Sequence, residues 1–106
     1  MATWRMLIGE ALKDAEESWE DVECIVFGIP RGYDPEWYGP LPDPADTEEC
    51  LEMPFDKGFG STNGMPFTMW TAERVYFPAC YDGAEWVDSV QRNPVNPHAK
   101  EHVGGG

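Results

Sequence analysis

The chain has 106 residues, of which 42% are hydrophobic and 13% aromatic, so it can form one packed core. Its 20 acidic and 7 basic side chains give a formal net charge of -13, and the basic residues are scattered along the sequence. Nucleic acid and anionic membrane surfaces are therefore excluded as direct partners, because both are bound through clustered Lys and Arg. The expected partner is a basic or neutral protein.

A cytoplasmic location is predicted. Residues 1–27 lack the basic start, apolar run and small-residue cleavage site of a signal peptide. No stretch approaches the roughly 20 apolar residues of a membrane span. The cysteines Cys24, Cys50 and Cys80 are odd in number and form no CxxC pair, so three reduced thiols are expected.

An amphipathic helix is predicted to begin after Thr3, its expected N-cap. Apolar residues recur from there at steps of three and four: Trp4, Ile8, Ala11, Leu12, Ala15, Trp19 and Val22. The opposite face carries a row of carboxylates: Glu10, Asp14, Glu17 and Asp21. Ser18 and Asp21 also match a second capping box, so the helix can break there and restart for one turn.

Residues 24–27 are apolar and partly β-branched, which predicts a short buried strand. Cys24 and, further along the chain, Cys80 are interpreted as small buried apolar residues.

The segment 30–66 has a different composition. It holds seven of the ten prolines, five glycines and eight acidic residues, so regular structure should be sparse. Aromatic side chains interrupt the prolines, which favours an ordered loop folded over the core. One short helical turn is expected within 43–52, capped by Asp46 or Thr47.

Three successive strands are predicted at 67–71, 74–81 and 85–90, joined as an antiparallel meander. The last two strands are separated by Asp82 and Gly83, the commonest residue pair of a two-residue hairpin, because both tolerate the positive φ of a type I′ turn.

The register set by this turn pairs Ala79 with Trp86, but it also places Phe77 opposite Asp88. Such a pair is a mismatch, and Pro78 cannot donate a hydrogen bond to the ladder. Both observations predict a β-bulge in this strand.

The predicted fold is α+β: an N-terminal amphipathic helix packs on a three- to four-stranded antiparallel sheet with a C-terminal β-hairpin and a long, ordered Pro/Gly-rich loop. Residues 1–92 should form a single acidic domain, and residues 93–106 a flexible tail.

Catalytic and cofactor motifs are weak in this sequence. His98 and His102 have the spacing of two metal ligands, but no further ligands accompany them, so a solvated tail is favoured over a metal site. The glycines around Ser61 lack the Gly-Lys-Ser/Thr of a phosphate-binding loop. No catalytic residue and no cofactor is predicted.

The net charge has two interpretations. It exceeds the magnitude of about 2 to 8 that keeps a small domain soluble, yet solubility alone is the simpler interpretation and is favoured. The alternative is a surface complementary to a basic protein. Its partner-binding residues would be the carboxylates Glu10, Asp14, Glu17 and Asp21, with the loop aromatics Tyr33, Trp37 and Tyr38.

The leading hypothesis is a small, non-enzymatic protein-binding module. By compositional analogy, such a protein suits a phage or plasmid accessory factor that inhibits a basic host nucleic-acid-binding protein by imitating the charge of DNA. Two alternatives stay open. One is a structural or assembly component that self-associates through the hairpin edge as a homo-oligomer, and the other is a small enzyme without a legible active site.

Overall fold

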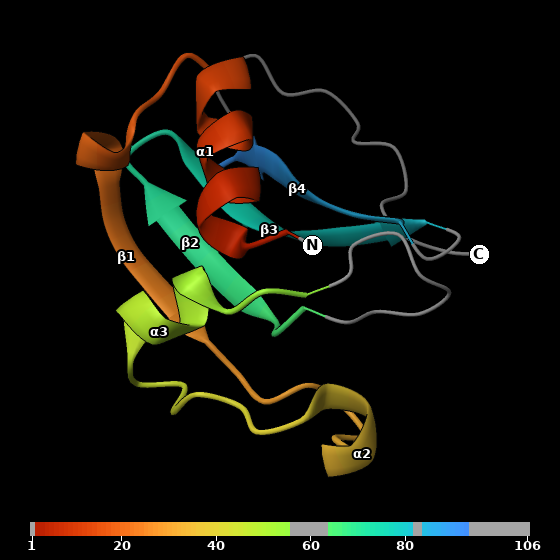
Figure 1. Cartoon of the computed structure of the whole chain (residues 1–106). Helices are drawn as coiled ribbons and strands as arrows, with labels where there is room; N and C mark the ends of the chain where they lie inside the picture. The colour runs from red at the N-terminus through yellow and green to blue at the C-terminus, as the bar shows by residue number, and fades with distance from the viewer. Residues whose placement is uncertain (1, 56–63, 82–83, 94–106) are drawn as a thin grey trace.

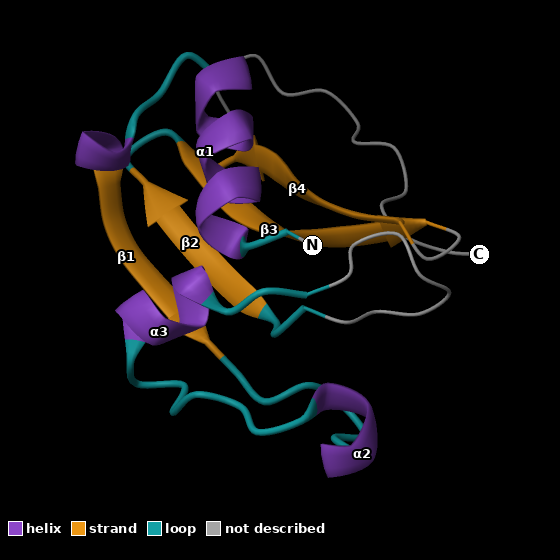
Figure 2. Ribbon diagram, in the orientation of Figure 1, coloured by secondary structure: helices purple, strands orange, loops and turns teal. Residues whose placement is uncertain are grey.

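A computed structural model of the chain describes residues 2–55, 64–81 and 84–93. The elements in chain order are α1 (Trp4–Asp14), the 3-10 helix η1 (Trp19–Asp21), β1 (Val22–Phe27), α2 (Pro35–Tyr38), α3 (Thr47–Glu52), β2 (Phe67–Thr71), β3 (Arg74–Tyr81) and β4 (Ala84–Gln91). The strands form one antiparallel sheet in the order β1-β2-β3-β4, with α1 and α3 on one face (Figures 1 and 2). The α+β class and the helix-on-sheet packing are as predicted.

The start of α1 is as predicted, whereas its end comes earlier than the apolar stripe suggests. Thr3 Oγ1 accepts a hydrogen bond from the backbone N–H of Met6 at 3.3 Å. The helix ends at Asp14, so Trp19 and Val22 lie outside it. A capping box between Ser18 and Asp21 starts η1, which confirms the predicted break and restart.

The end of α1 is a Schellman motif with an unusual residue at its left-handed position. The N–H of Glu16 donates to the carbonyl of Lys13 at 3.0 Å, and the N–H of Glu17 donates to that of Leu12 at 2.8 Å. Glu16 has a φ of 60°. This conformation costs a non-glycine residue roughly 1 to 2 kcal/mol, because its Cβ approaches the following carbonyl oxygen.

We expect Glu16→Gly to stabilise the protein by about 0.5 to 1 kcal/mol. The relief of strain exceeds the extra entropy that glycine adds to the unfolded chain. Urea denaturation monitored by circular dichroism measures the change. Glu16→Ala is the control, because it removes the same charge from the helix C-terminus but keeps the Cβ. Equal stabilisation by both variants would assign the gain to the charge instead.

The core lies between the two helices and the covered face of the sheet. The helices contribute Trp4, Leu7, Ile8, Leu12, Cys50 and Leu51, and the sheet contributes Phe27, Phe67, Met69 and Tyr76. The ring of Trp4 lies at the centre, with its centroid 4.6 Å from that of Phe55 and 5.0 Å from that of Phe67. Outside the core, Arg5 of α1 pairs with Glu48 and Glu52 of α3.

β3 and β4 pair in an uninterrupted register. Ala79 lies opposite Trp86 and Phe77 opposite Asp88, as predicted, but the predicted bulge near Pro78 is wrong. Proline fits here because β2 pairs with β3 only at residues 75 and 76, so the strand beside Pro78 has one neighbour instead of two.

The bulge lies in β1 instead, where the register with β2 shifts between Val22 and Cys24. β1 is an edge strand, so the prediction of a buried strand at residues 24–27 is also wrong. The side chain of Val26 is 54% exposed. Cys24 is exposed and Cys80 half-buried, contrary to prediction, and Cys50 is the buried thiol.

Between β1 and β2 the chain forms two short helices. α3 confirms the helical turn predicted within 43–52, and Asp46 caps it by accepting from the N–H of Glu49 at 3.2 Å. α2 was not predicted. It begins at Pro35 and is capped by Asp34, whose side chain accepts from the N–H of Glu36 at 2.9 Å.

Several predictions fall outside the described residues: the Asp82–Gly83 turn, the loop around Ser61, and the tail with His98 and His102. Among the helices that are described, none has the length and apolar character needed to cross a membrane.

Candidate protein-binding surface

The four predicted carboxylates do not share one helix face. Glu10 and Asp14 are exposed on α1, whereas Glu17 and Asp21 follow its end. Asp21 accepts the backbone N–H of Ser18 at 2.8 Å as part of the capping box. Glu10 and Asp14 are therefore free of the local structural contacts that hold the other two.

The side chain of Glu17 is hydrogen-bonded to two buried residues of the sheet. Its carboxylate accepts hydrogen bonds from the hydroxyls of Tyr76, at 2.5 Å, and Thr71, at 3.2 Å. Both donors belong to residues with 0% exposure. Burial, followed by the hydrogen bond and charge of Glu17, raises the pKa of Tyr76 above its ordinary value. Glu17 thus has a structural role that the sequence did not reveal.

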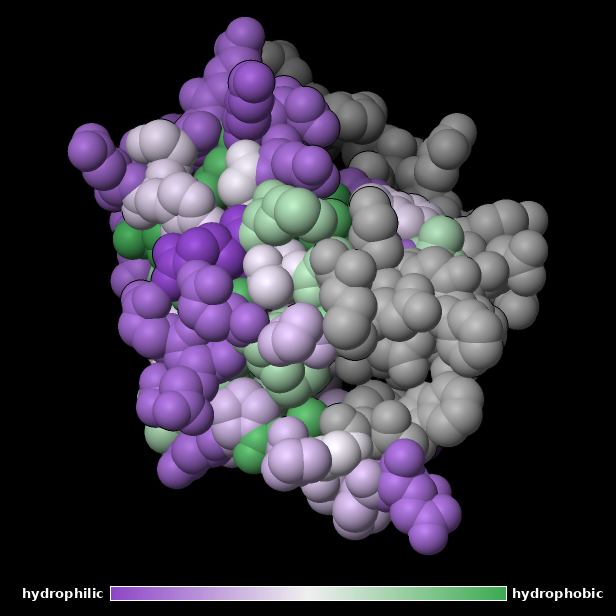
Figure 3. Space-filling view, viewed as in Figure 1, coloured by the Kyte–Doolittle hydropathy of each residue, from purple (hydrophilic) through white to green (hydrophobic). Residues whose placement is uncertain are grey.

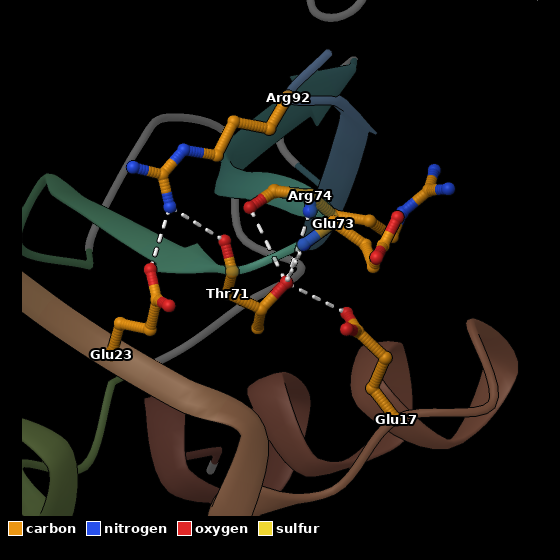
Figure 4. A network of polar contacts seen from close by, with 6 residues as sticks. All are labelled: Glu17, Glu23, Thr71, Glu73, Arg74 and Arg92. Carbon is orange, nitrogen blue, oxygen red and sulfur yellow. Dashed lines mark hydrogen bonds and ion pairs between the residues drawn. The ribbon is translucent and has the colours of Figure 1, made fainter. Parts of the chain in front are cut away.

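Thr71 is the centre of a polar network that joins three parts of the chain (Figure 4). Its Oγ1 accepts from the backbone N–H groups of Glu73, at 3.3 Å, and Arg74, at 3.0 Å, at the turn between β2 and β3. Its carbonyl accepts from Arg92 at 3.0 Å, and Arg92 also pairs with Glu23 at 2.6 Å. The network fixes β1 and the end of β4 against this turn.

An acidic groove opens beside the network, between the end of α1 and the ends of β3 and β4. It consists of two adjoining hollows of about 350 Å³ and 290 Å³, which share Ala15 and Arg74. Five acidic residues line it: Asp14, Glu16, Glu17, Asp21 and Glu73. Asp88 also borders it, although the register of β3 and β4 places its side chain on the opposite face of the sheet. The single basic lining residue is Arg74, whose Nε donates to Ser89 Oγ at 2.7 Å.

The groove has the electrostatics to receive basic side chains. Hydrophilic residues cover the end of the molecule at which α1 ends (Figure 3). Carboxylates bind Lys and Arg through charge-assisted hydrogen bonds. Within the described residues, no three His, Cys, Asp or Glu side chains are arranged to hold a metal ion.

The thiol of Cys50 is buried where it contacts the loop before α3. Burial, then the charges of Asp46, Asp43 and Glu49, raise the pKa of Cys50, so this thiol stays protonated. Its Sγ donates to the carbonyl of Asp43 at 3.3 Å. Cys50 is therefore part of the packing around α3.

The loop aromatics lie away from the groove. Tyr33 is 38% exposed, and its hydroxyl donates to the carbonyl of Gly39 at 2.8 Å across α2. Trp37 and Tyr38 belong to α2, and their side chains are outside the described part of the structure. Because α2 lies at the opposite end of the molecule from the C-terminus of α1 (Figure 1), the two predicted halves of the binding surface are separate.

Sequence reasoning missed the second face of the sheet, here called the open face, which points away from α1 and α3. The strand registers place on it Cys24, Val26, Thr68, Trp70, Val75, Phe77, Ala79, Trp86, Asp88 and Val90. A signal was present, because β2 and β3 carry large apolar residues at successive positions such as Met69 and Trp70. Strands of this kind are apolar on both faces.

Comparison of the chain with protein-family models, with curated proteins and with solved structures found no match.

Proposed function

We propose that this chain is a non-enzymatic protein-binding module that recognises a basic protein through the acidic groove and the exposed carboxylates of α1. The observation that carries the proposal is the lining of the groove, in which five acidic residues accompany one basic residue, Arg74. Such a surface attracts a basic partner over a distance and orders its Lys or Arg side chains on contact.

The proposal extends to the class of partner. A surface rich in carboxylates competes with nucleic acid for the same basic groups, so the partner is a nucleic-acid-binding protein that this chain inhibits by charge mimicry. Tyr33, Trp37 and Tyr38, in an ordered loop, form a second contact for a partner that extends to the other end of the molecule.

The test is affinity capture of basic proteins from a host lysate at low salt, with elution by increasing salt and identification by mass spectrometry. The variant pair Glu10→Lys and Asp14→Lys, combined in one chain, should weaken binding of the captured protein at least about tenfold, because attraction becomes repulsion. Neither side chain makes a hydrogen bond or ion pair within the described residues, so the fold should survive.

The matched control is Glu48→Lys combined with Glu49→Lys, which changes the net charge equally but on α3, away from the groove and from the loop aromatics. Loss of binding in both double variants would mean that only total charge matters, and the groove would not be a site. A duplex DNA that displaces the module from its partner supports charge mimicry, whereas a stable ternary complex contradicts it.

A further inference from the structure

Arg92 is a second basic residue at the rim of the acidic groove. Its neighbours in the chain, Gln91 and Asn93, both line the groove. Its own backbone N–H donates to the carbonyl of Glu73, another lining residue, at 2.8 Å. A long basic side chain is therefore anchored beside a groove in which acidic residues accompany a single lining arginine, Arg74.

A carboxylate of β1 holds the guanidinium of Arg92 away from the groove. Arg92 Nη1 donates to Glu23 Oε1 at 2.6 Å and to the carbonyl of Thr71 at 3.0 Å. Figure 4 shows this guanidinium and Glu23 on one side of Thr71, and Glu17, which lines the groove, on the other side. The side chains of Arg92 and Glu23 are 43% and 52% exposed, so solvent reaches both members of the pair.

The bulge in β1 places Glu23 in this position. The register with β2 passes from Val22 to Cys24, so Glu23 has no partner residue in the ladder between these strands. A bulge turns the side chain of its extra residue away from the regular alternation of the strand. The irregularity at the start of β1 thus has a consequence for the end of β4, because it presents a carboxylate to Arg92.

Two electrostatically favourable positions compete for Arg92. One is the ion pair with Glu23, and the other is the groove, whose lining includes the adjacent Glu73. An exposed ion pair is weak, so removal of Glu23 is enough to change the preferred position. A guanidinium inside the groove would neutralise a carboxylate there and would occupy the space of a basic side chain from the partner. The affinity for the partner falls by the fraction of molecules in this state.

We propose that Glu23 is a positioning residue that keeps the acidic groove open by holding Arg92 outside it. Without the charge of Glu23, Arg92 becomes an internal competitor of the basic partner. The inference rests on the proposed function, because it concerns the occupancy of the same groove.

Binding of a fluorescent oligolysine peptide to the full-length chain at low salt, measured by anisotropy, tests this proposal. Glu23→Gln should raise the Kd about fivefold, because Arg92 then occupies the groove. Arg92→Gln alone should change the Kd less than about twofold, since this side chain already lies outside. The double variant, which lacks both charges, should bind within about twofold of the natural chain.

Long-range charge without movement of Arg92 predicts a different pattern. Arg92→Gln would then strengthen binding by the same factor in the natural chain and in Glu23→Gln. The control is Glu20→Gln, which removes one charge from an exposed residue next to Asp21 of the groove and should change the Kd less than about twofold. Equal losses in Glu20→Gln and Glu23→Gln, or an additive double variant, would overturn the proposal.

A measurement without the peptide separates this inference from the proposed function. The carboxyl carbon resonance of Glu73, recorded by NMR on the free chain, should shift in Glu23→Gln because Arg92 has moved beside it. The double variant should restore the natural resonance, and identical spectra of Glu23→Gln and the double variant would contradict the movement. If the peptide does not bind the natural chain, the proposed function is wrong, whereas the Glu73 resonance still decides the position of Arg92.

Discussion

Gly64→Ala is expected to destabilise the protein by about 3 kcal/mol, because the new methyl group has no room. A Cβ on Gly64 would lie 2.5 Å from Cζ2 and 2.9 Å from Cε2 of Trp4. The indole is 1% exposed, and its Nε1 donates to the carbonyl of Met65 at 2.8 Å. It cannot move aside without losing this hydrogen bond and its ring contacts in the core. The midpoint of urea unfolding measures the loss.

Gly28→Ala is the matched control. A Cβ there would meet Cγ of Pro66 at 3.5 Å, which is an ordinary contact, so a change below about 1 kcal/mol is expected. The cost of Gly64→Ala should also fall when Trp4 is replaced by the smaller Phe, since the two sites share one contact. Equal losses in both glycine variants, or no coupling to Trp4, would contradict the clash as the cause.

The outline of this fold could be predicted because its local signals agree with its packing. Thr3 followed by an apolar stripe marks the start of α1, and runs rich in aromatic and β-branched residues mark β2 and β3 from their first residue to their last. The end of α1 could not be predicted, because its left-handed position is occupied by Glu16 where glycine is usual.

The prediction of a buried strand at residues 24–27 was wrong for a different reason, because β1 lies at an edge of the sheet. A run of apolar residues at 24–27 is compatible with a central strand and with an edge strand, since the number of neighbours is a property of the whole sheet. The predicted bulge at Pro78 was wrong for the same reason, because the sequence does not show how many strands lie beside this residue. Its missing N–H suggests a bulge until the short pairing between β2 and β3 is known.

The candidate site could be predicted only in part from the sequence, because some of its contacts depend on residues that are distant in the chain. Glu10 and Asp14 could be assigned to the exposed face of a helix from periodicity alone. Glu17 has the same periodicity, but its partners Thr71 and Tyr76 lie 54 and 59 positions away in the chain. No local pattern separates a solvated carboxylate from one that accepts buried hydroxyls.

Glu17→Ala is expected to destabilise the protein by about 2 kcal/mol, because two buried hydroxyl donors lose their acceptor. Glu17→Gln keeps an acceptor oxygen without the charge and should cost about half as much. Glu20→Ala, which removes an exposed carboxylate, is the control and should change stability by less than about 0.5 kcal/mol. Equal stability of Glu17→Ala and Glu20→Ala in urea would mean that the interior contact of Glu17 contributes nothing.

The free energy of unfolding measured at alkaline pH provides an independent test of the contact between Glu17 and Tyr76. Folding raises the pKa of Tyr76 above its ordinary value of 10.0, through burial first and Glu17 second. The stabilisation is therefore complete below pH 10 and is lost as the pH rises through the folded-state pKa, because the unfolded chain releases this proton first. Without Glu17 the folded-state pKa is less elevated, so the loss should end at a lower pH. Identical alkaline curves for the natural chain and Glu17→Ala would assign the whole effect to burial.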